Sequence, residues 1–185
     1  LISATPTGTP NQYDVVYDVY VRNYGSVPIT NVQLSDNLTT TNRAANLSNV
    51  TAAFTSNPAG FTLDGTYTGN SYINLLTPGQ TLRAYAVASN NFKIRISCRL
   101  SNILTGVVYN NSAIATANGF TGVALRDSST NGSNPDLNQN DKTDDPGEGQ
   151  PTPFIILLTP ITPPCAIFDT TLYNQDFGAG VGLNA

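Results

Sequence analysis

The stretch from residue 13 to residue 36, YDVVYDVYVRNYGSVPITNVQLSD, constrains the fold more than any other part of the chain. Its first half places aromatic and β-branched side chains at every second position, which is typical of a strand with one face in a core: Tyr13, Val15, Tyr17, Val19 and Val21. The segment 23–26 supplies a turn, because Asn and Gly tolerate positive φ. A second apolar run, 29–34, follows. The sequence therefore predicts a β-hairpin that needs a second sheet to bury its apolar face.

Short apolar runs separated by Gly, Pro and Asn continue along the chain at roughly ten-residue spacing, which is the pattern of a β-sandwich. Residues 1–10 give a strand-like start and a connector, and 52–54 give a brief apolar return. The other expected strands are 61–63, 72–76, 82–88, 92–98, 107–117, 122–126 and 154–158. In the run 107–117, Asn111 interrupts the apolar face. No segment shows an amphipathic helix of ten or more residues, so we expect an all-β, Ig-like antiparallel β-sandwich.

Composition narrows the classes of protein. Charged residues make up 11% of the 185 residues and hydrophobic residues 39%. The formal net charge of −4 argues against nucleic acid as a partner, because its phosphates need Lys and Arg. No run approaches the roughly 18 apolar residues of a membrane span, so we expect no membrane insertion by this segment. The chain begins in a strand-like run without Met, which we interpret as a piece of a longer polypeptide.

The residue types argue against an enzyme. The chain contains no His, so Ser–His and Cys–His nucleophile pairs cannot form, and zinc loses its commonest ligand. A glycosidase needs only two carboxyl groups. However, the carboxylates in the strands and turns show no spacing that singles out a pair: Asp14, Asp18, Asp36 and Asp64. We therefore expect no catalytic site and no organic cofactor.

The segment 127–150, DSSTNGSNPDLNQNDKTDDPGEGQ, lies between the last two expected strands and is unusually acidic. Lys142 is its only cation. The segment holds half of the acidic residues of the chain: Asp127, Asp136, Asp141, Asp144, Asp145 and Glu148. A loop of this length inside a compact domain is usually functional or disordered.

Calcium is the candidate ligand of this acidic loop. Asp136, Asn138 and Asn140 have the i, i+2, i+4 spacing by which an EF-hand loop directs successive oxygens at one cation. Asp141 stands where that loop has Gly, and Gly147 where it has Glu, so a complete EF-hand is excluded. A simpler site remains, formed by Asp136, Asn138, Asn140 and one or more of Asp141, Asp144 and Asp145. Crowded carboxylates repel one another unless a cation joins them. The alternative is a solvated acidic loop without metal.

The two cysteines allow one disulfide. Cys98 falls on the apolar face of its expected strand, and Cys165 lies beyond a Pro-rich stretch. An oxidising exterior would permit them to pair. A buried Cys98 thiol that behaves as a small hydrophobic side chain is the favoured reading. An internal Lys–Asn isopeptide bond is not expected, because Lys93 falls on a polar face and Lys142 lies in the acidic loop.

The domain organisation follows from these patterns. Residues 1–158 form the predicted sandwich module, with the acidic loop 127–150 inside it. Residues 159–164, TPITPP, form a Pro-rich linker that is expected to be stiff and extended. Residues 165–185 repeat nothing that precedes them. We interpret them as the beginning of a next β module or as an interaction tail.

Three stretches together resemble a known family: VVYDVYVRNYGSVPITNVQLSDNL, LLTPGQTLRAYAV and YNNSAIATANG. Their order and spacing resemble the Ig-like DUF11 repeat of bacterial surface proteins. The acidic segment through PTPF is similar to an Asp/Asn-rich segment of giant Bacteroidetes surface adhesins, including gliding-motility adhesins. The resemblance covers about residues 1–158. It implies an extracellular, outer-membrane-attached location, tandem modules of the same polypeptide as neighbours, and export by the type IX secretion route.

Three functions remain open at this point. The first is a structural and adhesive module whose tandem copies add reach and avidity, with surface glycans or other cell-surface proteins as partners. The second is a carbohydrate-binding module, although the absence of Trp weakens this hypothesis. Its candidate exposed aromatic rings are Tyr20, Tyr24, Tyr67 and Tyr72. The third is a filament subunit in which residues 165–185 or 1–9 insert as a strand into a neighbouring copy.

Overall fold

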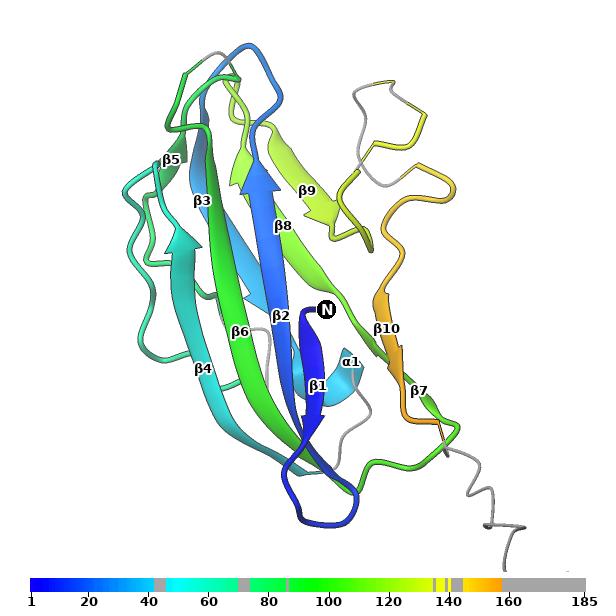
Figure 1. Ribbon diagram of the computed structural model, residues 1–185. Coiled ribbons are helices and arrows are strands. Elements are labelled where there is room, and N and C mark those ends of the chain that lie inside the picture. Colours follow the sequence, from blue (N-terminus) through cyan, green and yellow to red (C-terminus); the bar gives the residue numbers. More distant parts are fainter. Residues whose placement is uncertain are drawn as a thin grey trace, which may run out of the picture.

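The computed structural model describes residues 1–41, 46–69, 74–85, 87–134, 136–138, 140 and 145–157. They form a sandwich of antiparallel sheets (Figure 1). The first sheet has the order β1-β2-β6-β4: β1 (Ser3–Pro6), β2 (Gln12–Arg22), β6 (Asn91–Ser101) and β4 (Asn46–Ser56). The second sheet has the order β5-β3-β8-β9: β5 (Thr81–Leu82), β3 (Ile29–Asp36), β8 (Ala113–Asn118) and β9 (Ala124–Ser128). A further pair joins β7 (Val108–Asn111) to β10 (Thr152–Ile155), and α1 (Leu38–Thr41) is a single turn.

The strand order is that of an Ig constant-type sandwich, in which strands A-B-E-D face strands C-F-G. The order β1-β2-β6-β4 matches the first of these sheets, and β3-β8-β9 matches the second. Tyr109, near the start of β7, accepts a hydrogen bond on its hydroxyl from the Leu104 backbone N–H at 2.8 Å. This contact is the tyrosine corner of such sandwiches. The predicted all-β sandwich is therefore confirmed; the linker 159–164 and the segment 165–185 lie outside the described residues.

The longest ladder joins β2 to β6. It runs over eleven residue pairs, from Gln12–Ser101 to Arg22–Asn91, without a register shift. On the inner face of β6 every second side chain is buried in the core: Phe92, Ile94, Ile96, Cys98 and Leu100. On the outer face Arg95 pairs with Asp18 and Arg99 with Asp14, each through two hydrogen bonds of 2.7 and 2.9 Å. The predicted alternation of β2 and of residues 92–98 is confirmed.

The predicted hairpin at 13–36 is wrong. The strands β2 and β3 belong to opposite sheets, so segment 23–28 crosses the sandwich instead of folding one strand back on the other. The buried Asn23 shapes this crossing, because its Nδ2 donates to Val27 O at 2.8 Å and to Arg83 O at 2.9 Å, and its Oδ1 accepts from Gly25 N at 2.9 Å. A strand–turn–strand pattern fits a hairpin and a crossing equally well, since both bury one face of each strand.

Several strand boundaries also differ from prediction. Residues 52–54 lie inside the eleven-residue β4, which sequence reasoning reduced to a brief run. Among the described residues of the expected strands 61–63 and 72–76 there are only isolated bridges, Leu63–Leu76 and Ser35–Asn74. The described part of 82–88 contributes only Leu82, in the two-residue β5. Phe61, Leu75 and Leu76 fill the core from outside the named strands, whereas Tyr85 and Val87 are exposed. The expected strand 107–117 divides at Ser112 into β7 and β8.

Replacing Ile96 by Ala tests the facing of β6. Ile96 is fully buried, so we expect Ile96→Ala to lower the free energy of unfolding by about 2–5 kcal/mol. The neighbouring Arg95→Ala, on the solvent-facing side, is the matched control and should lower it far less. Urea unfolding followed by circular dichroism measures both. Equal losses for the two variants would contradict the assigned faces.

Candidate functional site

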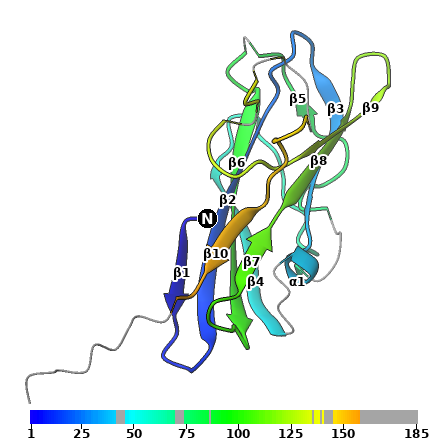
Figure 2. The same ribbon diagram turned by 90° about the vertical axis from the view of Figure 1, so that its right-hand side faces the viewer.

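The acidic segment interrupts one edge strand of the sandwich. The strands β9 and β10 pair with β8 and β7 in turn, so together they act as a single strand along one partner. Ser128 of β9 pairs with Ile114, and Thr152 of β10 pairs with Asn111. The chain thus advances 24 residues from β9 to β10 while its partner advances only three, so 21 residues (24 − 3) loop out. Figure 2 shows β10 alongside β7 after this insertion. The loop is therefore built into the framework at both ends.

Hydrogen bonds close the base of this insertion. The Asn131 backbone N–H donates to Gln150 O at 2.8 Å, and the Gly149 N–H donates to Thr130 Oγ1 at 2.9 Å. These contacts hold the two ends of the loop together beside the end of β9. The acidic groups between them are thus carried on a closed loop.

Glu148 organises the interior of the loop. Its side chain is buried, its Oε1 accepts from Leu137 N at 2.8 Å, and its Oε2 accepts from Asp145 N at 3.3 Å. The Glu148 N–H in turn donates to Asp145 O at 2.9 Å. Sequence reasoning did not include Glu148 among the candidate ligands. The available signal was its identity, because it is the only Glu in a chain whose other acids are all Asp.

Four of the six predicted ligands come together. The Asn140 N–H donates to Asp136 Oδ1 at 3.1 Å and to Asn138 Oδ1 at 3.2 Å. Asp145 Oδ2 accepts from Asn138 Nδ2 at 3.1 Å and from Asn140 Nδ2 at 2.5 Å. The other two predicted ligands, Asp141 and Asp144, lie outside the described residues. Among the described residues no group of three or more His, Cys, Asp or Glu could hold a metal ion. Calcium therefore stays a prediction.

The chemistry of the cluster suits a hard cation. Carboxylate and amide oxygens are the ligands that calcium prefers. Asn138 and Asn140 present their amide groups to Asp145, and each amide carries an oxygen beside its NH₂ group. The Asn138 oxygen already accepts from the Asn140 N–H, so this amide is held in its present orientation.

Thermal unfolding in EDTA and in millimolar calcium tests the predicted metal site. Calcium at a hundredfold excess over its Kd would stabilise the native chain by about 2.7 kcal/mol, which raises the unfolding midpoint of a domain of this size by roughly 5–10 °C. We expect Asp136→Ala to abolish that shift, and Asp64→Ala, which removes an acid elsewhere, to retain it. No shift in the native chain, or a shift retained in Asp136→Ala, would contradict calcium binding here.

Three polar side chains outside the acidic loop form a cluster inside the core: Asp36, Asn111 and Tyr67. The Asp36 side chain is fully buried at the end of β3, and its Oδ2 accepts from Asn111 Nδ2 at 2.7 Å. Its Oδ1 has no hydrogen-bond partner among the described residues. Burial raises the pKa of Asp36 to about 7, against the lowering effect of the Asn111 hydrogen bond. Tyr67 also contacts this residue, because its hydroxyl donates to the Asp36 backbone O at 3.1 Å. The interruption at Asn111 thus marks a buried contact between β3 and β7.

Cys98 is a free thiol beside this group. It is buried on the inner face of β6, and burial raises its pKa to about 12, with the Asp36 charge as a further cause. The reading of Cys98 as a buried hydrophobic thiol is confirmed. Its predicted partner Cys165 lies outside the described residues.

The pH dependence of stability tests the state of Asp36. A carboxyl group whose pKa is about 7 in the folded chain and near 3.8 in the unfolded chain binds its proton more tightly when folded. The free energy of unfolding should therefore fall as pH rises from about 4 to about 7 and level off above that. Asp36→Asn should flatten this decline in melts between pH 5 and pH 8, whereas Asp64→Asn should leave it unchanged. An unaltered profile in Asp36→Asn would refute the assignment.

The tyrosines predicted as candidates for glycan binding differ in their exposure and contacts. Tyr20 and Tyr24 are half exposed. Tyr24 stacks on Tyr85 with ring centroids 5.8 Å apart, and the Arg22 guanidinium lies 5.1 and 4.6 Å from the two rings. Sequence reasoning missed Tyr85. Tyr67 instead directs its hydroxyl at Asp36 O in the interior, and Tyr72 lies outside the described residues.

Comparisons of the chain with protein-family models, with curated proteins and with solved structures found no match. The resemblance to the DUF11 repeat family therefore stays a prediction. Helices long and apolar enough to cross a membrane are absent from the described part of the chain.

Proposed function

We propose that this chain is a structural and adhesive module of a large secreted bacterial cell-surface protein, in which it spaces or presents a binding surface. The observation that carries the proposal is the placement of β1 and β10. These two strands lie at edges of the sandwich, one against β2 and the other against β7, and they run toward the same end of it (Figures 1 and 2).

This placement determines which hydrogen bonds resist a force applied to the two ends of the chain. A pull that separates the start of β1 from the end of β10 draws each strand along its own axis. All the hydrogen bonds between such a strand and its partner then share the load and break together, whereas peeling would break them one at a time. The module is thus suited to transmit tension between neighbouring modules of one polypeptide.

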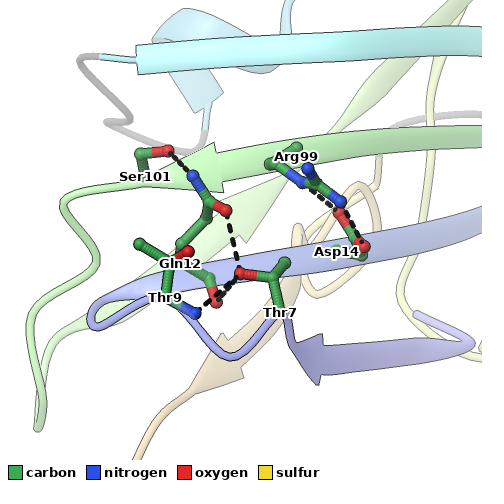
Figure 3. A network of polar contacts seen from close by, with 6 residues as sticks. All are labelled: Thr7, Thr9, Gln12, Asp14, Arg99 and Ser101. Carbon is green, nitrogen blue, oxygen red and sulfur yellow. Dashed lines mark hydrogen bonds and ion pairs between the residues drawn. The ribbon is translucent and has the colours of Figure 1, made fainter.

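Side chains fasten the chain just after β1 to the central ladder, at the end of β1 away from the one where load would arrive (Figure 3). Thr7 Oγ1 donates to Gln12 Oε1 at 2.8 Å, and Gln12 Nε2 donates to Ser101 Oγ at 3.0 Å, so one polar chain crosses from the end of β1 over β2 to β6. Beside it, the Arg99–Asp14 pair joins the same two central strands. Load on β1 is thereby passed to the β2–β6 ladder.

The location and partners belong to the same proposal. The resemblance supports an extracellular module attached to the outer membrane, exported by the type IX route and of the gliding-adhesin type. Surface glycans or other cell-surface proteins are the proposed external partners, and the exposed Tyr24–Tyr85 pair is a surface suited to a sugar ring. Calcium in the acidic loop would order the insertion and stiffen β10, where Phe154 stacks on Tyr109 with centroids 5.2 Å apart.

Single-molecule pulling on the two ends of the chain tests the mechanical role. The Thr7 N–H donates to Gln12 O at 3.2 Å, so alternate β1 residues bond to β2, Thr5 among them, while the Ala4 N–H faces away. We expect Thr5→Pro to lower the unfolding force and Ala4→Pro, the matched control, to leave it nearly unchanged. Equal forces for the native chain and both variants would show that β1 bears no load.

A further inference from the structure

The dipeptide Asn-Gly occurs twice in the chain, at 118–119 and at 131–132. In such a pair the backbone nitrogen of the glycine can attack the side-chain amide of the asparagine, because glycine has no Cβ to shield that nitrogen. Asparagine is among the thermolabile residues of proteins. Whether a pair reacts depends on how freely its two groups can approach each other, and the fold places the two pairs in opposite surroundings.

The pair Asn118–Gly119 is held in the hairpin that joins β8 to β9 (Figure 1). Asn118 is the last residue of β8 and pairs with Thr30 of β3 on one side and with Ala124 of β9 on the other. The Gly119 N–H donates to Val123 O at 2.8 Å, and neighbouring atoms lie within 4 Å of the position that a Cβ would take at Gly119. The nitrogen that would attack is therefore engaged, and the asparagine cannot turn without disturbing two strand pairings.

The pair Asn131–Gly132 lies at the base of the acidic insertion, and both of its residues are exposed. Gly132 has a φ of +106°, and beyond its chain neighbours no atom lies within 4 Å of the position that a Cβ would take there. The Gly132 N–H and the Asn131 side-chain amide make no hydrogen bond within the described part of the chain. Asn131 is anchored through its backbone N–H, which donates to Gln150 O at 2.8 Å. The attacking nitrogen and the amide are therefore free to approach each other.

We propose that Asn131 is a site of spontaneous modification, in which its side-chain amide becomes a carboxyl group. The Gly132 nitrogen loses its proton to hydroxide and forms a bond to Asn131 Cγ, while the bond from Cγ to Nδ2 breaks and ammonia leaves with a proton taken from water. Water then opens the resulting cyclic imide at either carbonyl group. Opening at Cγ gives aspartate, and opening at the backbone carbonyl gives isoaspartate, in which the main chain runs through Cβ and Cγ.

The modification changes the base of the acidic loop. Isoaspartate adds one atom to the main chain directly after the Asn131 N–H, whose bond to Gln150 O closes the loop. Either product also adds a negative charge to the segment 127–150, which already holds half of the acids of the chain, and like charges repel. Both changes weaken the closure, so the contact between Gly149 N and Thr130 Oγ1 should loosen as the chain ages. This modification does not depend on the adhesive role proposed above.

Mass spectrometry after incubation of the full chain in mildly alkaline buffer tests the proposal. Cleavage after Arg99, Arg126 and Lys142 places the two pairs in separate peptides, 100–126 and 127–142. We expect Asn131 to convert at least about tenfold faster than Asn118, a ratio that corresponds to a local opening cost of about 1.4 kcal/mol at the hairpin. In urea, where the hairpin is lost, the two pairs should convert at similar rates. Equal rates in the folded chain, or the same tenfold ratio in urea, would overturn the proposal.

Hydrogen exchange at the Gly149 N–H tests the effect on the loop. Asn131→Gln is the matched control, because it keeps an exposed amide whose longer side chain closes a ring far more slowly. Exchange at Gly149 should become faster with incubation in the native chain and stay constant in Asn131→Gln. Constant exchange in a native chain whose Asn131 has been converted would show that the modification leaves the closure intact, which would contradict the proposed effect.

Discussion

The uninterrupted pairing of β2 with β6 is the contact on which the rest of the structure depends. Its inner face supplies the middle of the core, and its outer face is closed by the Arg95–Asp18 and Arg99–Asp14 pairs. β1 and β4 extend the same sheet on either side. The second sheet is shorter and interrupted, so its strands obtain their position largely by packing onto this ladder. The acidic insertion follows β9, the last strand of this second sheet.

Part of this arrangement could be predicted from sequence, because period-two alternation reports which face of a strand is buried. It identified the inner faces of β2 and β6 and the position of the acidic loop between the last two strands. It did not reveal that residues 23–28 cross between sheets, since that depends on what Asn23 contacts sixty residues away at Arg83. Nor did it separate strands from core-filling stretches such as Leu75–Leu76, because burial gives both the same apolar composition.

In the candidate site, too, contacts between neighbours in sequence could be predicted and contacts between distant residues could not. The Asp and Asn spacing of the loop placed Asp136, Asn138 and Asn140 together, because neighbouring residues in a short loop have little freedom to separate. Glu148 and the Asp36–Asn111 contact were missed as groups with a role. Glu148 lies eleven residues from the Leu137 N–H that it binds, and Asp36 and Asn111 are 75 residues apart. Only the fold brings them together, although the polar Asn111 on an apolar face was a sign of a buried partner.

Residue-resolved hydrogen exchange tests the central place of the β2–β6 ladder most directly. The backbone N–H groups of Val15, Val19 and Val21 face β6, so they should exchange only through global unfolding and be among the slowest in the chain. Amides of β9 and β10, at the interrupted edge, should exchange faster through local opening. Slowest exchange in β8 and β9, with rapid exchange at those three valines, would contradict the account.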